Sequence, residues 1–356
     1  MGANVLRDFL SRLVRREALS RDDAEHLLNA LLDEDATDAQ IAAVLVALTA
    51  KGETVEELAG MAAALRTHAV RIRCQHLCFV DTAGTGSSPA KTFNISTAAA
   101  FVIAGAGLPV AKHGNRAVSS RSGSADLLSA LGVNVNASPE VSEQCLNEID
   151  ICFMFAPLYH GATARVAGIR RQLGIHTTFN LLGPLSNPAG APRQIVGVWR
   201  RDLVERMAKV LAASGTERAW VVHGEDGLDE ITLATKTLVA EVKGENVSSF
   251  EVEPKTFGLW RGSLEHLRGG DAKANGQIIL EVLSGKRRDE ARALVVANAA
   301  AALFVGGISS DLRAAAKAAE ESIDGGAART KLDQLIERTN RGPQVGSPLG
   351  TVGKTF

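Results

Sequence analysis

The sequence predicts an α/β protein with a small all-helical N-terminal domain and a larger α/β domain around a central, mostly parallel sheet. Three observations support this fold class. Through about residue 70, the apolar side chains recur only at helical spacing. From about Leu77 onward, short apolar runs alternate with longer helical stretches, which is typical of parallel strands joined by helices. The 356 residues are 46% hydrophobic but only 4% aromatic, so Ala, Leu and Val must fill a sizeable core.

The N-terminal region is expected to form a bundle of short amphipathic helices, which we assign to residues 1–76. Apolar side chains have helical spacing in two stretches, Leu6-Phe9-Leu10-Leu13 and Ala24-Leu27-Leu28-Leu31. Capping-box pairs mark three helix starts: Ser20 with Asp23, Thr37 with Gln40 and Thr54 with Glu57. Gly52 is the expected end of the helix before it. Such helices must cover their apolar stripes against one another, the main body or a second subunit.

The α/β domain is assigned to residues 77–338. Its candidate strands are residues 78–81, 109–112, 151–155, 195–199, 219–223 and 238–242. Beyond Asn275 the pattern is helical to about Arg338, with breaks at Gly306-Gly307 and Gly325-Gly326. The tail, residues 339–356, is rich in Gly and Pro and is expected to be flexible.

Composition argues against several classes of protein. The net charge is −1 and no run of Lys and Arg occurs, so no nucleic-acid partner is expected. No apolar stretch reaches the roughly 20 residues of a membrane span, and the N-terminus lacks a signal-peptide pattern, so we expect a cytoplasmic protein with no membrane partner. The four cysteines fit no common zinc spacing and are expected to pack as small apolar residues: Cys74, Cys78, Cys145 and Cys152.

A polar loop after the second candidate strand has the composition of a phosphate-binding loop. It reads Lys112-His113-Gly114-Asn115-Arg116-Ala117-Val118-Ser119-Ser120 and is followed by Ser122-Gly123-Ser124. Glycines let backbone N–H groups approach an anion, serines donate hydrogen bonds, and Lys and Arg supply charge. A solvated surface loop would also fit this composition.

A second loop of this kind follows the first candidate strand. It reads Gly84-Thr85-Gly86-Ser87-Ser88, and Asn94-Ile95-Ser96-Thr97 then opens an apolar helix, whose N-terminus favours anions. Alone, such a loop is more often a tight turn. Both loops follow strands and precede helices, which is where α/β proteins bind ligands. Together they indicate a ligand with more than one phosphate.

These motifs, with Asp229-Glu230, resemble those of the anthranilate phosphoribosyltransferase family over about residues 5–335. The resemblance implies transfer of the 5-phosphoribosyl group from phosphoribosyl diphosphate to the amine of anthranilate, giving N-(5-phosphoribosyl)anthranilate and pyrophosphate in tryptophan biosynthesis. It implies a helical and an α/β domain joined by a hinge, with a segment near residues 168–188 crossing back to the helical domain. It also implies a homodimer through the helical domain.

The resemblance assigns binding of the phosphoribosyl diphosphate donor to a large set of polar and loop residues. These are Gly84, Ser87, Ser88, Thr92, Asn94, Ile95, Ser96, Thr97, Lys112, His113, Gly114, Asn115, Arg116, Ala117, Val118, Ser119, Ser120 and Ser124. The first loop departs from the family pattern, because Ser87-Ser88 stands where the family usually has Gly-Asp. A flexible residue and a carboxylate are therefore missing beside the diphosphate.

The resemblance also implies Mg²⁺ as cofactor, held by Ser96, Asp229 and Glu230. Oxygen ligands of this kind suit that ion. The acidic pair could instead belong to a surface turn, but the strand at residues 219–223 places it at a sheet edge where a ligand would lie. Anthranilate is assigned to Gly84, His113, Asn115, His160 and Arg170, since a planar guanidinium suits its carboxylate. Taken alone, His160 is more often a structural residue at a helix start.

No side chain is assigned as a catalytic acid, base or nucleophile, because the aromatic amine is neutral at pH 7 and positioning and electrostatics can supply the acceleration. Two alternatives stay open. One is a nucleoside phosphorylase of similar fold, against which the segment 112–120 and Arg170 argue. The other is a non-catalytic paralogue, which should have lost the anthranilate residues and gained basic surface.

Overall fold

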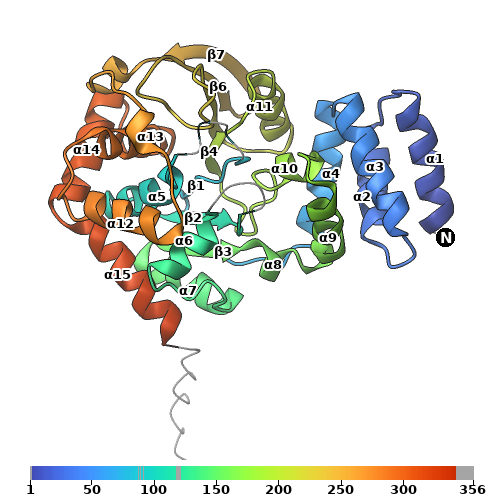
Figure 1. Ribbon diagram of the computed structural model, residues 1–356, viewed down its shortest axis with the longest axis horizontal. Coiled ribbons are helices and arrows are strands. Elements are labelled where there is room, and N and C mark those ends of the chain that lie inside the picture. The colour runs from blue at the N-terminus through green and yellow to red at the C-terminus, as the bar shows by residue number, and fades with distance from the viewer. Residues whose placement is uncertain (1, 87, 89, 91, 118–121, 342–356) are drawn as a thin grey trace, which may run out of the picture.

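The computed structural model describes residues 2–86, 88, 90, 92–117 and 122–341 of the protein. A bundle of helices stands beside a larger α/β body built on a seven-stranded sheet (Figure 1). The fold class predicted from the sequence is confirmed. Residues 342–356, most of the predicted flexible tail, lie outside the described residues. None of the helices within the described ranges is long and apolar enough to cross a membrane.

The N-terminal bundle consists of short helices, the last three of which begin at the predicted caps. Its members are α1 (Gly2–Val14), α2 (Arg21–Leu32), α3 (Asp38–Lys51) and α4 (Val55–Thr67). The Ser20 hydroxyl accepts a hydrogen bond from the N–H of Asp23, and full capping boxes open α3 and α4. Gly52 follows α3 with a φ of 83°, a conformation that glycine adopts readily.

Two short helices from the middle of the chain pack on this bundle. Helix α9 (Ala164–Leu173) lies against α2 and α3, and α10 (Thr178–Leu182) lies against α3 and α4. The buried Thr178 hydroxyl donates to the Glu53 carboxylate over 2.6 Å, which ties α10 to the loop between α3 and α4. Both helices lie between the bundle and the α/β body (Figure 1).

The sheet has the strand order β3-β2-β1-β4-β5-β6-β7. Strands β1 to β5 run parallel, and β6 and β7 are antiparallel to their neighbours. The strands are β1 (Val80–Asp81), β2 (Val110–Gly114), β3 (Ile151–Phe155), β4 (Arg193–Gly197), β5 (Arg218–Gly224), β6 (Thr237–Lys243) and β7 (Asn246–Val252). From β1 the chain proceeds to β2 and β3 on one side, then returns to place β4 and β5 on the other. The switch point between β1 and β4 is where such sheets bind ligands.

The observed strands differ from the predicted ones in three informative ways. Strand β2 extends to Gly114, two residues beyond the expected end at Lys112, so His113 and Gly114 belong to the strand and not to the loop after it. Strand β4 begins and ends two residues earlier than expected. Strand β7 was missed because it is an edge strand whose side chains are mostly exposed, so no apolar run marks it.

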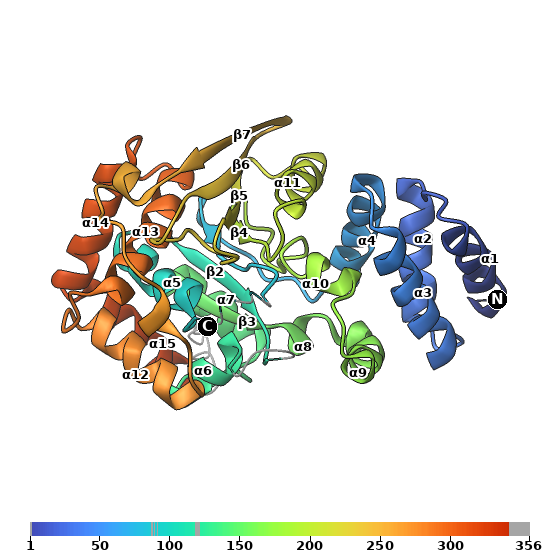
Figure 2. The same cartoon turned by 45° about the horizontal axis from the view of Figure 1, so that its top comes forward.

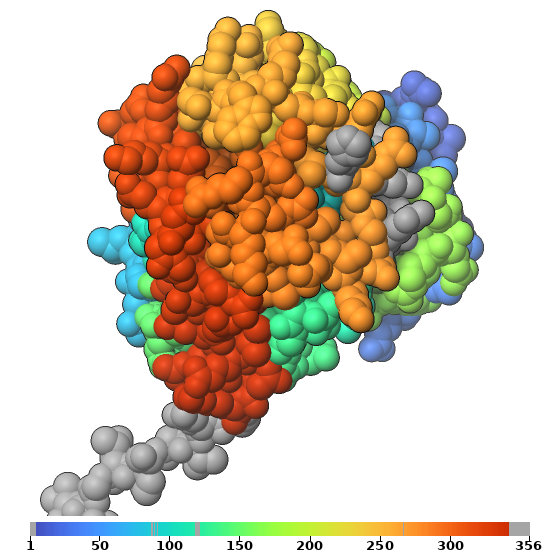
Figure 3. All heavy atoms as spheres, turned by 60° about the vertical axis from the view of Figure 1, so that its left-hand side comes forward, coloured from blue at the N-terminus to red at the C-terminus, as the bar shows by residue number. Residues whose placement is uncertain are grey.

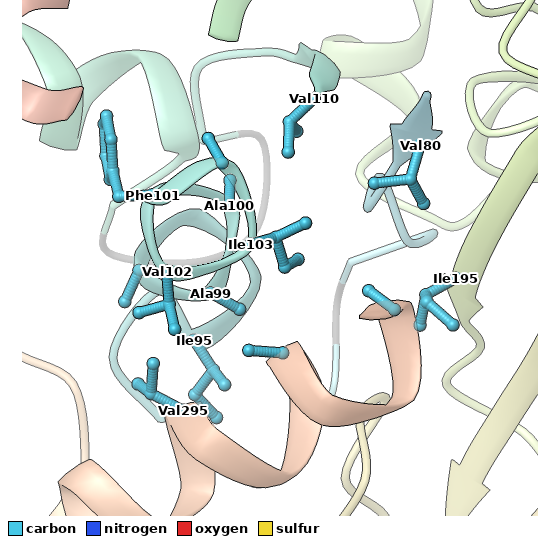
Figure 4. Close-up of a cluster of buried hydrophobic side chains, with 14 of the residues drawn as sticks. Val80, Ile95, Ala99, Ala100, Phe101, Val102, Ile103, Val110, Ile195 and Val295 are labelled. Carbon is cyan, nitrogen blue, oxygen red and sulfur yellow. The ribbon is translucent and has the colours of Figure 1, made fainter. Parts of the chain in front are cut away.

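Helices cover both faces of the sheet (Figure 2). Helix α11 (Leu203–Ala213) packs on β5 and β6 and also contacts α4, so the core on this face continues into the helical bundle. The opposite face is covered mainly by α5 (Ile95–Gly105) and α13 (Glu290–Val305). Figure 4 shows α5 side chains meeting Val295 of α13 and strand residues Val80, Val110 and Ile195.

The C-terminal helices form the outer wall of the α/β body, drawn orange to red in Figure 3. They are α12 (Ala272–Leu283), α14 (Leu312–Asp324) and α15 (Ala327–Asn340), whereas α13 of the same segment is almost wholly buried. The segment breaks at the two predicted glycine pairs. The remaining elements are short: α6 (Ser124–Ala130), α7 (Pro139–Ile149), α8 (Ala156–Tyr159), η1 (Gly161–Thr163), η2 (Pro254–Phe257) and η3 (Glu265–Leu267).

Candidate active site

A cavity of about 520 Å³ lies at the carboxyl ends of the parallel strands. Its walls are the loops that follow β1, β2 and β5 and the end of β4, together with the N-terminus of α5 and parts of α9, α10 and α13. The volume is in the range of small-ligand sites. Parallel strands end at the same sheet edge, so topology brings loops from distant parts of the sequence to one place.

The glycine loop after β1 packs tightly on the end of β4. The backbone N–H and the hydroxyl of Thr85 both donate to the carbonyl of Gly197, over 2.8 Å and 3.0 Å. A Cβ on Gly84 would lie 2.9 Å from the same carbonyl oxygen. Glycine at position 84 therefore permits a close backbone approach beside the cavity.

The start of α5 brings several predicted donor residues to the cavity. Thr92, Asn94, Ser96 and Thr97 line it, whereas Ile95 does not. The side chain of Ile95 is buried in the core and its N–H donates to the carbonyl of Phe93.

The amide of Asn94 is itself held by the protein. Its Nδ2 donates to the carbonyl of Ser122 and its Oδ1 accepts from Asn275 Nδ2, both over 3.2 Å. Asn94 therefore connects the α5 N-terminus to the second loop.

Lys112 points from β2 into the floor of the cavity and is buried. Its Nζ donates to the Thr82 hydroxyl over 3.1 Å and to Ser96 Oγ over 3.3 Å. Burial lowers the pKa of Lys112, while the nearby carboxylates of Asp81 and Glu230 act in the opposite direction. This places a cation beside the predicted phosphate-binding groups.

The second loop folds back onto the start of α6. The Asp126 carboxylate accepts from the N–H groups of Ala117 and Gly123 and from the Arg116 guanidinium, over 2.9–3.0 Å. A Cβ on Gly123 would lie 2.4 Å from the nitrogen of Ala117. Gly114, Asn115, Arg116, Ala117 and Ser124 all line the cavity. The predicted residues Ser87, Val118, Ser119 and Ser120 lie outside the described residues.

The acidic pair after β5 faces the cavity from the side of β4. Glu230 accepts a hydrogen bond from the N–H of Ser96 over 3.1 Å. Both carboxylates keep some contact with solvent in the cavity but are otherwise surrounded by protein. Burial raises the pKa of Asp229 to about 6, and burial together with the Asp229 charge raises the pKa of Glu230. Two carboxylates that oppose each other's ionisation are a favourable place for a cation.

The opposite wall of the cavity carries Arg170, from α9. Its Nη2 donates to Asn180 Oδ1 over 3.1 Å and its guanidinium lies 5.6 Å from the Phe179 ring centre. Within the described residues it pairs with no carboxylate. Loss of hydration lowers its pKa. An unpaired, half-hydrated guanidinium is suited to bind a ligand carboxylate.

The two predicted histidines lie near this wall. The rings of His113 and His160 are 5.1 Å apart, and of these two only His113 lines the cavity. Burial lowers the pKa of His113 to about 4 and that of His160 to about 3, so both rings are neutral at pH 7. Nε2 of His113 and both ring nitrogens of His160 are buried without a hydrogen-bond partner in the described part of the chain.

Sequence reasoning missed several residues that organise the site. Buried Asp81 accepts from the N–H of His113 over 3.3 Å and from Asn187 Nδ2 over 2.7 Å. A lone carboxylate at the end of an apolar strand was the available signal for it. Asn180 and Asn298 also line the cavity, but nothing in their local sequence distinguishes them from surface asparagines.

Comparison with known proteins gives consistent matches over nearly the whole chain. Residues 77–329 match a family model described as the a/b domain of a glycosyl transferase family, and residues 7–69 match its helical bundle domain. The anthranilate phosphoribosyltransferase of Anaeromyxobacter dehalogenans (strain 2CP-C) is 52% identical, over 93% of this chain and 97% of the relative. That of Desulfosudis oleivorans is 48% identical with the same coverage.

Two solved structures are also similar to this chain over nearly its whole length. Anthranilate phosphoribosyltransferase from Thermus thermophilus has a TM-score of 0.87 and 36% identity, covering 93% of this chain and 98% of that one. The enzyme from Saccharomyces cerevisiae, in complex with PRPP (phosphoribosyl diphosphate) and Mg, has a TM-score of 0.87 and 28% identity, covering 95% and 98%.

Proposed function

The chain belongs to the anthranilate phosphoribosyltransferase family, and we propose that the cavity at the switch point of its sheet holds both substrates. The protein transfers the 5-phosphoribosyl group from phosphoribosyl diphosphate to the amine of anthranilate in tryptophan biosynthesis, with Mg²⁺ as cofactor. One observation carries the assignment to this cavity. Two anion-binding loops and an acidic pair line one end, and an arginine without a carboxylate partner within the described residues lines the other.

The donor is assigned to the end formed by the two loops, the α5 N-terminus and Lys112. Short polar side chains and backbone N–H groups there can bind phosphate oxygens, and Lys112 adds positive charge. Of the donor residues expected from the sequence, Ile95 fits this role least, because its side chain and its N–H are both engaged elsewhere.

The Asp229-Glu230 pair fits Mg²⁺ by its chemistry. Within the described ranges no cluster of three or more His, Cys, Asp or Glu side chains is placed to hold a metal. The pair and Ser96 therefore supply few protein ligands, and substrate oxygens and water complete the coordination, as is usual for this ion. Bound there, Mg²⁺ supplies positive charge to the diphosphate as it leaves.

Anthranilate is assigned to the wall that carries Arg170. Its carboxylate pairs with the guanidinium, and Gly84, His113 and Asn115 line the same cavity. His160 acts behind His113, because it does not reach the cavity itself. Because the rings of His113 and His160 are neutral at pH 7, Arg170 is the cation that faces anthranilate.

The reaction exchanges one bond at the anomeric carbon. The bond to pyrophosphate breaks, the bond to the anthranilate nitrogen forms, and that nitrogen then releases a proton. The amine is neutral at pH 7 and needs no base before attack. The protein's task is therefore to hold two substrates at a fixed distance and orientation in a cavity that limits water.

A direct assay tests this function. Anthranilate is fluorescent, so its signal should fall when purified protein, phosphoribosyl diphosphate and Mg²⁺ are combined. Reactions without donor, and with Asp229→Asn plus Glu230→Gln, are the controls. An unchanged signal with the wild-type protein would contradict the function. The two alternatives, a nucleoside phosphorylase and a non-catalytic paralogue, have no support in the relatives described.

We also propose that the protein is cytoplasmic and that it forms a homodimer through the helical bundle. An apolar groove between α1 and α3 supports the dimer: Val14 is 70% exposed and Val46 41% exposed, beside Leu10 and Leu13. Light scattering should give twice the chain mass, and Val46→Glu should give a monomer. Val70→Glu, at a valine 47% exposed elsewhere, is the control. A monomeric wild-type protein with full activity would refute the dimer.

The division into domains at residues 1–76 and 77–338 is likewise proposed. The match to the helical bundle domain ends at residue 69 and the match to the a/b domain begins at residue 77, which supports a boundary in this interval. The packing of α9 and α10 on α2, α3 and α4 supports the proposed crossing segment near residues 168–188. Limited proteolysis should cut between the two units before it cuts within either.

A further inference from the structure

Asn298 holds the backbone immediately after the acidic pair. It lies on α13, is 5% exposed, and lines the cavity. Its Nδ2 donates to the carbonyl of Ile231 and its Oδ1 accepts from the N–H of the same residue, both over 3.0 Å. One side-chain amide thus satisfies both backbone groups of Ile231, as a neighbouring strand would.

The orientation of this amide is determined by a third contact. Nδ2 also donates to the carbonyl of Leu294, one helical turn earlier, over 2.9 Å. The nitrogen therefore uses both of its hydrogens within the protein. Asn298 has no donor left for a substrate, so its contribution to the site must pass through Ile231.

The loop that carries Asp229 and Glu230 requires such support. Asp229 and Glu230 are neighbouring carboxylates that line the cavity together and are largely enclosed by protein, so repulsion between them favours a displacement of the loop toward solvent. On the other side, the carbonyl of Asp229 passes so close to β4 that a Cβ on Gly197 would lie 1.6 Å from it. The loop is therefore held between the end of β4 and the amide of Asn298.

Helix α13 also supports the third predicted metal ligand. It packs along α5, whose first turn carries Ser96, and residues of both helices share the buried core (Figure 4). One buried helix thereby sets the position of the carboxylates and of the hydroxyl that faces them. Groups that orient metal ligands commonly change metal affinity about 10–100-fold when they are removed.

We propose that Asn298 is a positioning residue for the metal site: its paired hydrogen bonds to Ile231 hold Asp229 and Glu230 in the cavity so that they bind the cation together. This inference rests on the proposed role of the acidic pair. The competing explanation is that Asn298 merely satisfies the buried backbone of Ile231 and adds only to stability.

The test measures metal binding directly. Mn²⁺ replaces Mg²⁺, and free Mn²⁺ is counted by electron paramagnetic resonance in the presence of phosphoribosyl diphosphate. Asn298→Leu, which keeps the size and removes all three hydrogen bonds, should weaken Mn²⁺ binding about tenfold or more. Amide exchange of the peptide containing residues 225–231 should accelerate, and the Mg²⁺ concentration for half-maximal rate should rise, with the anthranilate KM within about twofold.

Two further variants keep the experiment decisive. Asn298→Ala, whose cavity admits water to Ile231, replaces the leucine variant if that one does not fold. Ser322→Ala is the matched control, since it removes a buried 2.9 Å hydrogen bond to Val102 from the same domain. It should lower thermal stability without changing Mn²⁺ affinity.

The outcomes separate the inference from its premise. Unchanged Mn²⁺ affinity in a folded Asn298 variant, or an equal loss in Ser322→Ala, overturns the positioning role. If Asp229→Asn with Glu230→Gln has lost Mn²⁺ binding at the same time, the metal assignment stands and only the role of Asn298 falls. Wild-type Mn²⁺ binding by that double variant overturns both.

Discussion

The end of the cavity that we assign to the donor and the end that we assign to anthranilate differ in how their polar groups are held. At the donor end, Lys112, Asn94 and Glu230 each have protein partners between 3.1 and 3.3 Å away. At the anthranilate end, the Arg170 guanidinium has one amide partner, and the ring nitrogens of His160 have none within the described residues. The elements differ as well, because the donor groups lie at the edge of the sheet while Arg170 comes from a helix that packs on the bundle.

This difference indicates that the two ends depend on different parts of the fold. The groups at the donor end are already held in place by strands and loops of one sheet. The protein therefore needs little rearrangement to bind a highly charged molecule there. The anthranilate end depends on the packing of α9 and α10 against the helical bundle. Substitutions should therefore separate into those that affect the donor and metal and those that affect the acceptor alone.

The largest effect is expected at the acidic pair. Asp229→Asn with Glu230→Gln should reduce kcat/KM by at least about 10²-fold, because the metal supplies several kcal/mol of charge stabilisation. The thermal midpoint without Mg²⁺ should be unchanged or higher, since the substitution removes buried charges that repel each other. Steady-state rates and calorimetry measure the two quantities. Wild-type activity at low Mg²⁺ would show that the pair is only an acidic turn.

Arg170→Ala should affect the other end alone. Loss of a charge-assisted pair costs about 1.5–3 kcal/mol, which raises the anthranilate KM about 10–150-fold. The donor KM should stay within about twofold of wild type. Arg171→Ala, at the exposed neighbour, is the matched control and should change neither. An equal loss of donor binding would remove the distinction between the two ends.

The buried histidines should make the fold sensitive to mild acid. Their folded pKa values, about 4 for His113 and about 3 for His160, lie below the ordinary value of 6.5, so the unfolded chain binds more protons below that pH. Stability should therefore be fully present above pH 6.5 and fall as the pH drops from 6.5 toward 4, by about 1–3 kcal/mol per ring.

Urea denaturation at several pH values measures this dependence. His160→Asn should flatten the curve between pH 7 and 5, whereas His26→Asn, at an exposed ring, should leave its slope unchanged. Identical slopes for wild type and His160→Asn would show that the ring is not held neutral by burial.

The smallest effect is expected for Asn180→Ala. This amide accepts from Arg170 and from the N–H of Thr177, over 3.1 and 3.0 Å, so its loss should loosen the guanidinium without removing it. We expect a cost of about 0.5–1.5 kcal/mol, or about 2–12-fold in the anthranilate KM. Gln172→Ala, at an exposed residue of α9, is the control. A change in donor KM instead would place Asn180 at the other end of the cavity.

Much of the fold, and the loops that meet at the cavity, could be predicted from the sequence. Helix caps such as Thr37 and Thr54 act within one turn of chain, so local sequence contains the whole signal. The two loops were recognisable because glycines and serines follow apolar strands, and the order of strands and helices places such loops at one edge of a sheet. The edge strand β7 was not predicted because most of its side chains are exposed, so its sequence has no apolar pattern.

The sequence by itself determined the fold class, the starts of three N-terminal helices and the two polar glycine-containing loops, and a family resemblance gave the candidate ligands of the metal. Only the tertiary structure decided which of these groups meet. It directed the Lys112 side chain into the cavity, placed Ile95 and His160 off the cavity wall, and brought Asn298 to Ile231, 67 positions away in the chain. The physical reason is that burial, close backbone approach and hydrogen-bond pairing are properties of surroundings assembled from several elements, which no local pattern of residues specifies.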